Sequence, residues 1–280
     1  MKLYIKSILV LFFVVFSSCE DKIDVQVPLG TTRLVIEASL GWAKGTEGNN
    51  QSIKLSTSTA YFDTSKNNKA IGASVKVTND NSGAEYFFVD QKDGTYAISN
   101  FVPIINDSYT LEVVYNNETY VAHETLMPVV KINNIKQSRE EGLDKQLLEV
   151  TVSWSDPVDE ENYYLVKLER EDTVLPMLSS FSDEFNNGND IEEFFEKGGE
   201  GDEGPFLVDD VVDIYLYGVS KQYLNYIQLL IKQYYIADGN LFGTIPSEIK
   251  GNCINLDNTD NYAFGYFRLS EYDTVNYTFK

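Results

Sequence analysis

Apolar and polar residues alternate with a period of two along most of residues 31–125. Successive side chains of a strand point to opposite faces, so this period places one face of each segment in a core and the other in water. Turn-forming pairs such as Asp93-Gly94 and Asn116-Asn117 separate the runs. The alternating apolar positions include Leu34, Ile36, Ala38, Leu40, Ile71, Ala73, Val75, Val77, Tyr109, Leu111, Val113 and Tyr115. Short strands at this spacing predict an N-terminal β-sandwich over residues 31–128.

A second β region follows Pro128. Apolar runs within residues 129–135, 147–154 and 163–168 have the length of strands, and a tyrosine-rich strand pattern returns near the C-terminus. Many short strands with few helices are typical of sandwiches. We therefore predict a mostly β fold with two sandwich domains, the second over residues 129–280.

Residues 220–238 carry the helical period of the chain. Ser220 is a good N-cap, and Gly239 is a natural stop. The apolar residues that recur at spacings of three and four are Tyr223, Ile227, Leu230 and Tyr234, with Leu224 and Ile231 beside them. We expect this amphipathic helix to pack its apolar stripe on the second sheet.

Residues 181–213 form a contrasting segment, in which acidic residues outnumber basic ones by twelve to one. We predict an acidic insertion in the second sandwich, and its simplest interpretation is a solvated, self-repelling loop, mobile at least in part. Its carboxylates also make calcium a candidate, although placing Gly188 at the sixth position of an EF-hand loop puts phenylalanines at positions three and twelve. A third interpretation is a partner-docking segment, because aromatic residues punctuate the acids. These candidate docking residues are Phe181, Phe185, Phe194, Phe195 and Phe206.

The N-terminus has the pattern of an export signal. Lys2 and Lys6 precede an apolar run over residues 8–16, which is too short to span a bilayer. Two serines then lead to Cys19, which suits a lipoprotein signal peptidase. We predict a signal peptide over residues 1–18, lipidation of Cys19 by acyl chains such as palmitate, and a tether over 19–30; an ordinary secretory signal is the alternative. Several acyl chains on one residue give durable membrane anchoring.

Charge and composition exclude several functions. The formal net charge is −21, a sign that repels nucleic acids and anionic lipid surfaces. One histidine and two cysteines leave too few ligands for a Cys/His zinc site. His123 lies in an alternating segment with no nucleophile pattern near it, which favours a strand histidine over a catalytic base. We therefore expect a protein that is not an enzyme, with no catalytic residues and, the calcium candidate apart, no metal or cofactor.

Several motifs carry resemblances to known modules. Gly72-Ala73-x-Val75 and Asp93-Gly94-x-Tyr96 resemble transthyretin-like or carboxypeptidase-regulatory-like modules, so the first sandwich is expected to be transthyretin- or immunoglobulin-like. Trp154, Asp156-Pro157 and Tyr163-Tyr164 together resemble a fibronectin type III or immunoglobulin-like sandwich. The acidic residues after Cys19 resemble a surface-export signal of Bacteroidota. Asp-Thr-Val triplets at Thr173 and Thr274 resemble a Bacteroidota O-glycosylation sequon.

The order of motifs over nearly the whole mature chain resembles one family. The ordered motifs are Cys19-Glu20-x-x-Ile23-Asp24, Leu34-Val35-Ile36-Glu37, Gly72-Ala73-x-Val75, Trp154-x-Asp156-Pro157, Gly239-Asn240-Leu241-Phe242, Ile245-Pro246, Gly251-Asn252-x-Ile254 and Gly265-Tyr266-Phe267. They resemble the Bacteroidota lipoproteins grouped as the domain of unknown function 4249 family. The acidic insertion and Cys253 depart from the pattern, which puts any shared ligand in doubt.

The resemblance implies an accessory lipoprotein of the outer membrane, of a kind often encoded beside TonB-dependent transporters. We therefore expect a lipid-anchored subunit, exposed at the cell surface, that binds an outer-membrane β-barrel protein of a transport, secretion or barrel-assembly complex. The alternative is a surface glycan- or peptide-binding lipoprotein, because 19 tyrosines and 16 phenylalanines could supply stacking platforms.

Overall fold

The computed structural model describes residues 30–59, 68–140, 142–158, 160–171, 173, 175–185, 187–197, 204–237 and 249–280. Residues 30 and 31 apart, these residues belong to one compact unit. The predicted signal peptide, Cys19 and nearly all of the tether lie outside the described residues. Within the described ranges, no helix has both the length and the apolar character needed to cross a bilayer.

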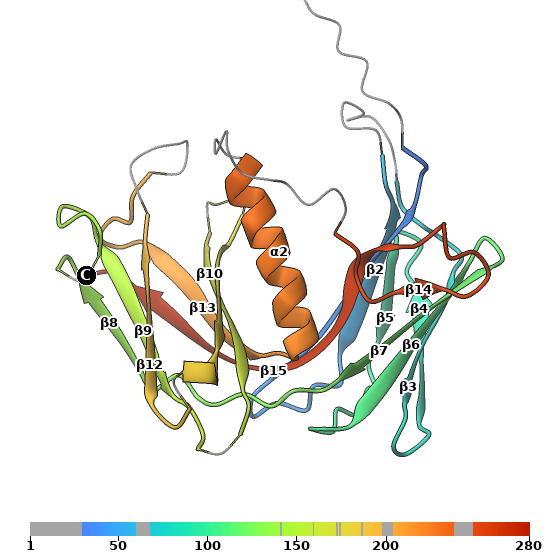
Figure 1. Cartoon of the computed structure of the whole chain (residues 1–280), viewed down its shortest axis with the longest axis horizontal. Coiled ribbons are helices and arrows are strands. Elements are labelled where there is room, and N and C mark those ends of the chain that lie inside the picture. Colours follow the sequence, from blue (N-terminus) through green and yellow to red (C-terminus); the bar gives the residue numbers. More distant parts are fainter. Residues whose placement is uncertain are drawn as a thin grey trace, which may run out of the picture. The chain divides into compact units, whose positions relative to one another are not determined.

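Most strands join one long sheet, whose order is β11-β10-β13-β15-β1-β2-β5-β4-β3-β6-β7-β14. Residues 34–125, in which apolar and polar residues alternate, supply seven strands of this sheet (Figure 1). These strands are β1 (Leu34–Ala43), β2 (Gln51–Thr57), β3 (Ser74–Asn79), β4 (Glu85–Asp90), β5 (Thr95–Ile98), β6 (Ser108–Tyr115) and β7 (Glu118–Thr125). The inward residues of these strands form the first core, which includes Ile36, Leu55, Val77, Tyr96, Tyr109 and Leu111.

The second part of the chain supplies the other strands. They are β8 (Asn134–Ser138), β9 (Glu149–Ser155), β10 (Tyr163–Arg170), β11 (Met177–Ser182), β12 (Asp190–Glu196), β13 (Val211–Gly218), β14 (Ile254–Asn255) and β15 (Phe264–Thr278). A separate sheet in the order β12-β9-β8 packs against β10, β13 and the end of β15. This second core surrounds Trp154, whose side chain is fully buried and meets Tyr164 edge-on at 5.6 Å between ring centroids. The predicted fold class, mostly β with sandwich-like sheets and a helix, is confirmed.

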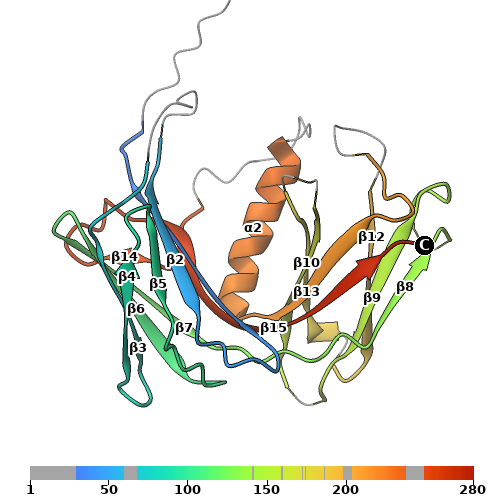
Figure 2. The same cartoon turned by 180° about the vertical axis from the view of Figure 1, so that it is seen from behind.

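Strand β15 belongs to both cores. Residues 264–272 of β15 pair in parallel with β1, and residues 272–278 pair antiparallel with β13 (Figure 2). Phe267 and Leu269 therefore enter the first core, and Phe279 just beyond the strand enters the second. The predicted division at residue 128 is corrected in this respect, because Cys253 and Ala263 also pack in the first core. Residues far beyond the predicted boundary thus complete the N-terminal sandwich.

The linker between the sandwiches is fixed to β15 by carboxylates. Glu271 accepts a hydrogen bond from the Val129 backbone N–H at 2.9 Å and forms an ion pair with Lys44 at 2.7 Å. Lys44 also donates to the Val129 carbonyl oxygen at 2.7 Å, and Asp273 accepts from the Ile132 N–H at 2.8 Å. We call Glu271, Lys44 and Val129 the seam, because they lie where the two cores meet.

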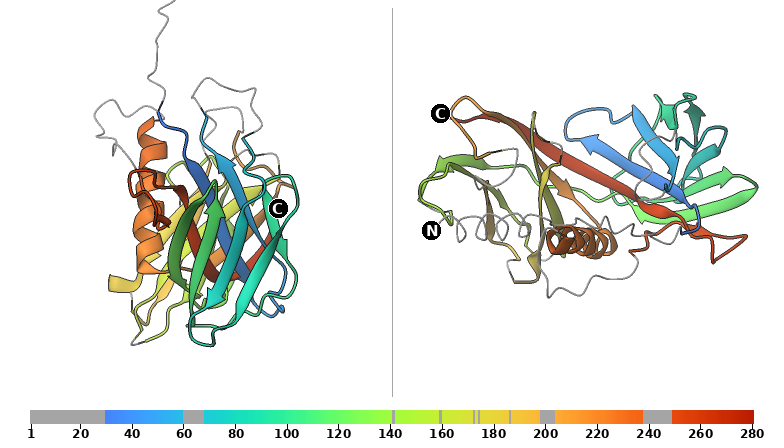
Figure 3. Two further views of the ribbon diagram at one scale, coloured as in Figure 1. Left: turned by 90° about the vertical axis from the view of Figure 1, so that its right-hand side faces the viewer. Right: turned by 90° about the horizontal axis from the view of Figure 1, so that it is seen from above.

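The α-helix within the described part of the chain is α2 (Lys221–Ala237), close to the predicted range. The Ser220 hydroxyl accepts a hydrogen bond from the Tyr223 N–H at 3.1 Å, as an N-cap does. The apolar stripe of α2 packs on Leu165 of β10, Tyr217 of β13 and Tyr266 of β15. The view along the helix axis shows α2 beside β15 (Figure 3, right).

The acidic segment 181–213 contains regular structure, which corrects its interpretation as a loop. It includes the end of β11, a short 3-10 helix η1 (Asp183–Phe185), the whole of β12 and the start of β13. Strand β12 pairs antiparallel with β9 over its full length. Ile191 and Phe195 point into the second core, whereas Glu192 and Phe194 point outward. Asp190 and Glu192 occupy the solvent face, whereas Glu193 shares the inward face with Ile191 and Phe195 and is partly buried.

Candidate functional site

The face of β10, β13 and β15 that carries α2 gathers aromatic and basic side chains. The strand register places Lys167 opposite Tyr215 and Tyr215 opposite Thr274, while Tyr217 lies opposite both Leu165 and Tyr272. Directly opposite residues share one face of a sheet, so these side chains and α2 lie on the same side. We call this surface the helix-bearing face.

Three tyrosines pack together on the helix-bearing face. The ring centroids of Tyr215 and Tyr217 are 6.0 Å apart, and the Tyr272 centroid lies 5.9 Å from the first and 5.2 Å from the second. The Lys167 ammonium lies 4.2 Å from the Tyr215 ring centroid, within cation–π range. Burial raises the pKa of Tyr215 and raises the pKa of Tyr217 to about 12. The Tyr215 and Tyr217 hydroxyls are therefore protonated donors at neutral pH. We call Tyr215, Tyr217 and Tyr272 the tyrosine stack.

A buried arginine lies next to the tyrosine stack. The guanidinium carbon of Arg268 is 4.5 Å from the Tyr217 ring centroid and 5.1 Å from that of Tyr223. Nearby, Glu124 accepts hydrogen bonds from the Ser220 hydroxyl at 2.9 Å and the Tyr266 hydroxyl at 3.3 Å. Arg268 and Glu124 are each 8% exposed, and the charge of Arg268 only partly offsets the desolvation that raises the pKa of Glu124.

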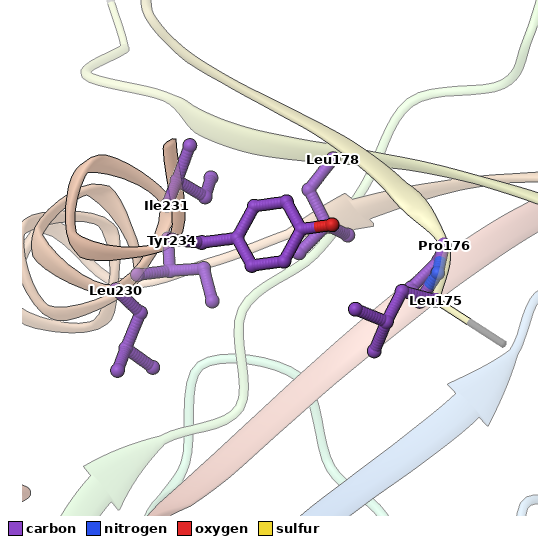
Figure 4. A pocket seen from close by; sticks show the side chains of 7 residues that line it. Leu175, Pro176, Leu178, Leu230, Ile231 and Tyr234 are labelled. Carbon is purple, nitrogen blue, oxygen red and sulfur yellow. The ribbon is translucent and has the colours of Figure 1, made fainter. Parts of the chain in front are cut away.

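An apolar groove lies between α2 and β11. Its volume is about 220 Å³, and its lining residues are Leu175, Pro176, Leu178, Ile227, Leu230, Ile231 and Tyr234. Figure 4 shows the Tyr234 ring extending from the helix toward the chain around Pro176. Leu175 is 52% exposed and Tyr234 is 53% exposed, although both are large and largely apolar. Apolar side chains that line a groove and also face water mark a surface suited to a partner.

The sequence matches the model of a protein family. The model described as a domain of unknown function (DUF4249) matches residues 20–275. The chain belongs to the DUF4249 family. The lipoprotein character and the Bacteroidota origin that the motifs implied stay predictions. No curated protein sequence matches the chain.

Several solved structures are similar to the DUF4249 chain at low identity. A two-domain fibronectin type III segment of chicken tenascin is 11% identical, covers 61% of this chain and 83% of its own, and has a TM-score of 0.21. A cytokine receptor complex is 9% identical over 68% of this chain and 85% of its own, with a TM-score of 0.25. A DUF4785 family protein from Legionella pneumophila is 14% identical over 68% of this chain and 52% of its own, with a TM-score of 0.24. With TM-scores this low, neither the fold nor the role of these proteins is transferred to the DUF4249 chain.

The five predicted docking phenylalanines do not form one surface in the DUF4249 protein. Phe195 and Phe206 are core residues, and Phe206 stacks on Phe279 at 4.8 Å between ring centroids. Phe181 is half-buried and meets Trp154 edge-on at 5.4 Å. Phe194 faces outward on β12, and the side chain of Phe185 lies outside the described residues. Phe195 and Phe206 therefore present no ring to a partner.

The other predicted sites are placed in part. Thr274 is exposed on the helix-bearing face, whereas Thr173 is half-buried and its hydroxyl donates to the Arg170 carbonyl oxygen at 2.9 Å. Their glycosylation stays a prediction. Among the residues that the structure describes, no group of three or more His, Cys, Asp or Glu side chains is arranged to hold a metal ion. Calcium binding by the acidic segment stays a prediction.

His123 and Cys253 have structural surroundings. His123 lies in β7, where its Nδ1 is 2.8 Å from the hydroxyl of Thr110 in β6. Cys253 is buried in the first core, and burial raises the pKa of its thiol to about 12. The Thr110 hydroxyl also lies 2.8 Å and 2.9 Å from the two carboxylate oxygens of Asp80, so His123 takes part in a cross-strand polar contact.

Sequence reasoning did not identify the apolar groove or Arg268. The helical stripe at Leu230, Ile231 and Tyr234 was recognised, but its only predicted role was to pack on a sheet. A stripe that extends to the exposed Tyr234 is the signal that could have indicated a groove. Arg268 interrupts the apolar run of β15, and a charged residue in such a strand predicts a buried, compensated charge.

Proposed function

We propose that this DUF4249 protein is a non-enzymatic, lipid-anchored subunit of the outer membrane, exposed at the cell surface, that binds a β-barrel protein of a transport, secretion or barrel-assembly complex. It would cap, gate or stabilise the external loops of the barrel, or help to capture its substrate. The observation that carries this proposal is the apolar groove between α2 and β11.

The groove favours a protein partner over a lipid surface. Burying the exposed parts of Leu175 and Tyr234 would remove apolar area from water, at about 25 cal/mol per Å². The net charge of −21 disfavours close approach to anionic lipid headgroups. Acyl chains at Cys19 would hold the protein beside integral barrels, and the family resemblance points to TonB-dependent transporters among them.

The test is affinity purification of the tagged full-length chain from detergent-solubilised membranes of its own organism. The wild type is expected to recover one β-barrel protein in stoichiometric amount. The double variant Leu175→Ser, Tyr234→Ser is expected to lose it, because both side chains leave the groove while their half-exposed positions spare the core.

Leu143→Ser is the matched control, because Leu143 is 90% exposed and does not line the groove. It is expected to recover the barrel as the wild type does. Recovery of the wild-type lipoprotein without a barrel contradicts the proposal. If the double variant still recovers the barrel and its thermal unfolding is unchanged, the interface with the barrel lies outside the groove.

A second candidate function is the binding of a glycan or a peptide at the cell surface. The tyrosine stack supports this alternative, because the rings of Tyr215 and Tyr272 are only partly buried, and phenol rings suit ligands that have both apolar and polar faces. The measurement is a glycan and peptide array probed with the mature chain. Blank arrays contradict this candidate.

A further inference from the structure

Strands β4 and β5 part from each other on the first sandwich. β4 pairs with β5 only at Val89 with Ala97 and at Asp90 with Tyr96. Earlier in β4, Phe87 pairs with Lys76 of β3 instead. A hollow of about 590 Å³ lies between β4 and the end of β5, where Ser99 and Asn100 follow the strand. This volume lies within the roughly 300–1,000 Å³ of typical small-molecule sites.

One wall of this hollow is apolar and unusually exposed. Tyr86 and Phe88 point into the first core, so Phe87 and Val89 must point outward. Phe87 is 60% exposed and Val89 is 64% exposed. The two side chains stand next to each other on one face of the strand and present an aromatic ring and a branched methyl surface to water.

The rest of the lining is polar but uncharged. Its amide and hydroxyl side chains are Asn50, Gln51, Ser52, Gln91, Ser99 and Asn100, and Ala97 and Ile98 complete it. Among the residues that the structure describes, the lining holds no Asp, Glu, Lys or Arg, in a chain in which 23% of residues are charged. Gln51 forms the buried base, where its amide donates to the carbonyl oxygens of Gly41 at 2.8 Å and Gly48 at 2.9 Å.

Charged residues beside Phe87 and Val89 are engaged in ion pairs. Lys76, which pairs with Phe87 across the strands, forms an ion pair with Glu85 at 3.1 Å. Asp90 accepts a hydrogen bond from the Gly72 N–H at 2.8 Å and pairs with Lys92 at 3.0 Å. A charged ligand would therefore lose hydration in the hollow without meeting a counter-charge among the described lining residues.

We propose that this hollow is a binding site for a neutral glycan. A sugar ring has an apolar C–H face, which the Phe87 ring and Val89 complement, and a rim of hydroxyls that both donate and accept hydrogen bonds. Side-chain amides do both as well, so Asn50, Gln91 and Asn100 match neighbouring hydroxyls. This inference deepens the second candidate function and rests on it for the class of ligand, but it assigns a site other than the tyrosine stack.

The test begins with a glycan array and continues with calorimetric titration of the neutral glycans that bind. The mature lipidated chain is used in micelles of a zwitterionic detergent, because a maltoside head group would itself be a sugar. Phe87→Ala is expected to weaken binding by roughly tenfold, the loss of one stacking contact. The dissociation constant is expected to stay the same between low and high salt, because a neutral ligand has no charge to screen.

Phe194→Ala is the matched control, because Phe194 is also an outward phenylalanine on a strand but lies on the second sandwich. It is expected to bind as the wild type does. Weaker binding by Tyr215→Ala with unchanged binding by Phe87→Ala overturns the site and leaves the second candidate function standing. Binding only of anionic glycans, with strong salt dependence, overturns the neutrality of the ligand. A blank array overturns both this site and the second candidate function, while the barrel purification still tests the first function separately.

Discussion

Burial favours the neutral form of two ionisable side chains that lie beside β15. Cys253 packs in the first core near Phe267, and Glu124 accepts a hydrogen bond from Tyr266. Desolvation is the largest cause of the raised pKa of each group. A charge at either position loses solvation by water, which an apolar core does not replace.

The Cys253 thiol is expected to be unreactive in the folded protein. Its pKa of about 12 leaves almost no thiolate at neutral pH, and its sulfur is shielded from reagents. With a chromogenic disulfide reagent, the mature chain is expected to react only on unfolding in urea and then to show one thiol. Two thiols in the unfolded chain contradict lipidation of Cys19. Fast reaction before unfolding contradicts the burial of Cys253.

Glu124 is expected to make stability depend on pH. Its pKa in the folded protein is raised above the ordinary value of 4.5. Folded protein therefore retains a proton at pH values where the unfolded chain has released it, so the free energy of unfolding falls as pH rises from that ordinary value to the folded pKa. At pH values above the folded pKa, the contribution of Glu124 to the free energy of unfolding is fully lost and no longer changes with pH.

The measurement is urea unfolding of the wild type and of Glu124→Gln from about pH 4 to pH 8. As pH rises, the free energy of unfolding of the wild type is expected to fall relative to that of Glu124→Gln, because glutamine cannot ionise. Glu193, whose pKa burial also raises, is present in both proteins and cancels in the difference. A difference that does not change with pH contradicts the raised pKa of Glu124.

At the scale of elements, the cap of helix α2 links it to the first sandwich. The Ser220 hydroxyl accepts from the Tyr223 N–H and donates to Glu124 of β7. Ser220→Ala removes both contacts and is expected to lower the free energy of unfolding by about 1–2 kcal/mol. Ser220→Thr keeps a hydroxyl and is expected to stay close to the wild type. Equal stability of all three proteins in urea would show that the cap contributes nothing.

Elements that depend only on one short segment were predictable from the sequence, whereas elements that depend on a distant partner strand were not. Helix α2 was predictable because its cap and its apolar stripe are properties of one short segment. Strand β12 was not, because Glu192 and Glu193 obscure the inward pattern of Ile191 and Phe195 and make the segment resemble a loop. Local acidity competes there with a cross-strand partner, β9, that no short window contains.

Sites built from distant segments were the least predictable. The apolar groove needs Leu175 and Leu178 of one segment to meet the end of α2. The hollow needs β4 and β5, which pair at only two positions along their length. The sequence did contain one local hint, because in the apolar run over residues 86–89 a period of two forces Phe87 and Val89 outward.

At the scale of the whole molecule, β15 makes the two sandwiches dependent on each other. The first half of β15 pairs with β1 and its second half pairs with β13. If the first half detaches, the second half, which completes the second core, is therefore loosened. The seam reinforces this connection, since the carboxylate of Glu271 bonds both the linker and Lys44. The two sandwiches are therefore expected to unfold as one cooperative unit.

The two tryptophans allow this cooperativity to be measured, because Trp42 packs against the first core and Trp154 lies within the second. In Trp154→Phe the remaining fluorescence follows the first sandwich, and in Trp42→Phe it follows the second. Within each variant, the urea midpoint by fluorescence is expected to coincide with the midpoint by far-ultraviolet circular dichroism, which follows both sandwiches. Glu271→Ala, added to either variant, leaves the buried Val129 N–H without its acceptor and is expected to lower both midpoints together, by about 1–3 kcal/mol of stability. Separate midpoints by the two methods would mean that each sandwich unfolds alone and that β15 does not couple them.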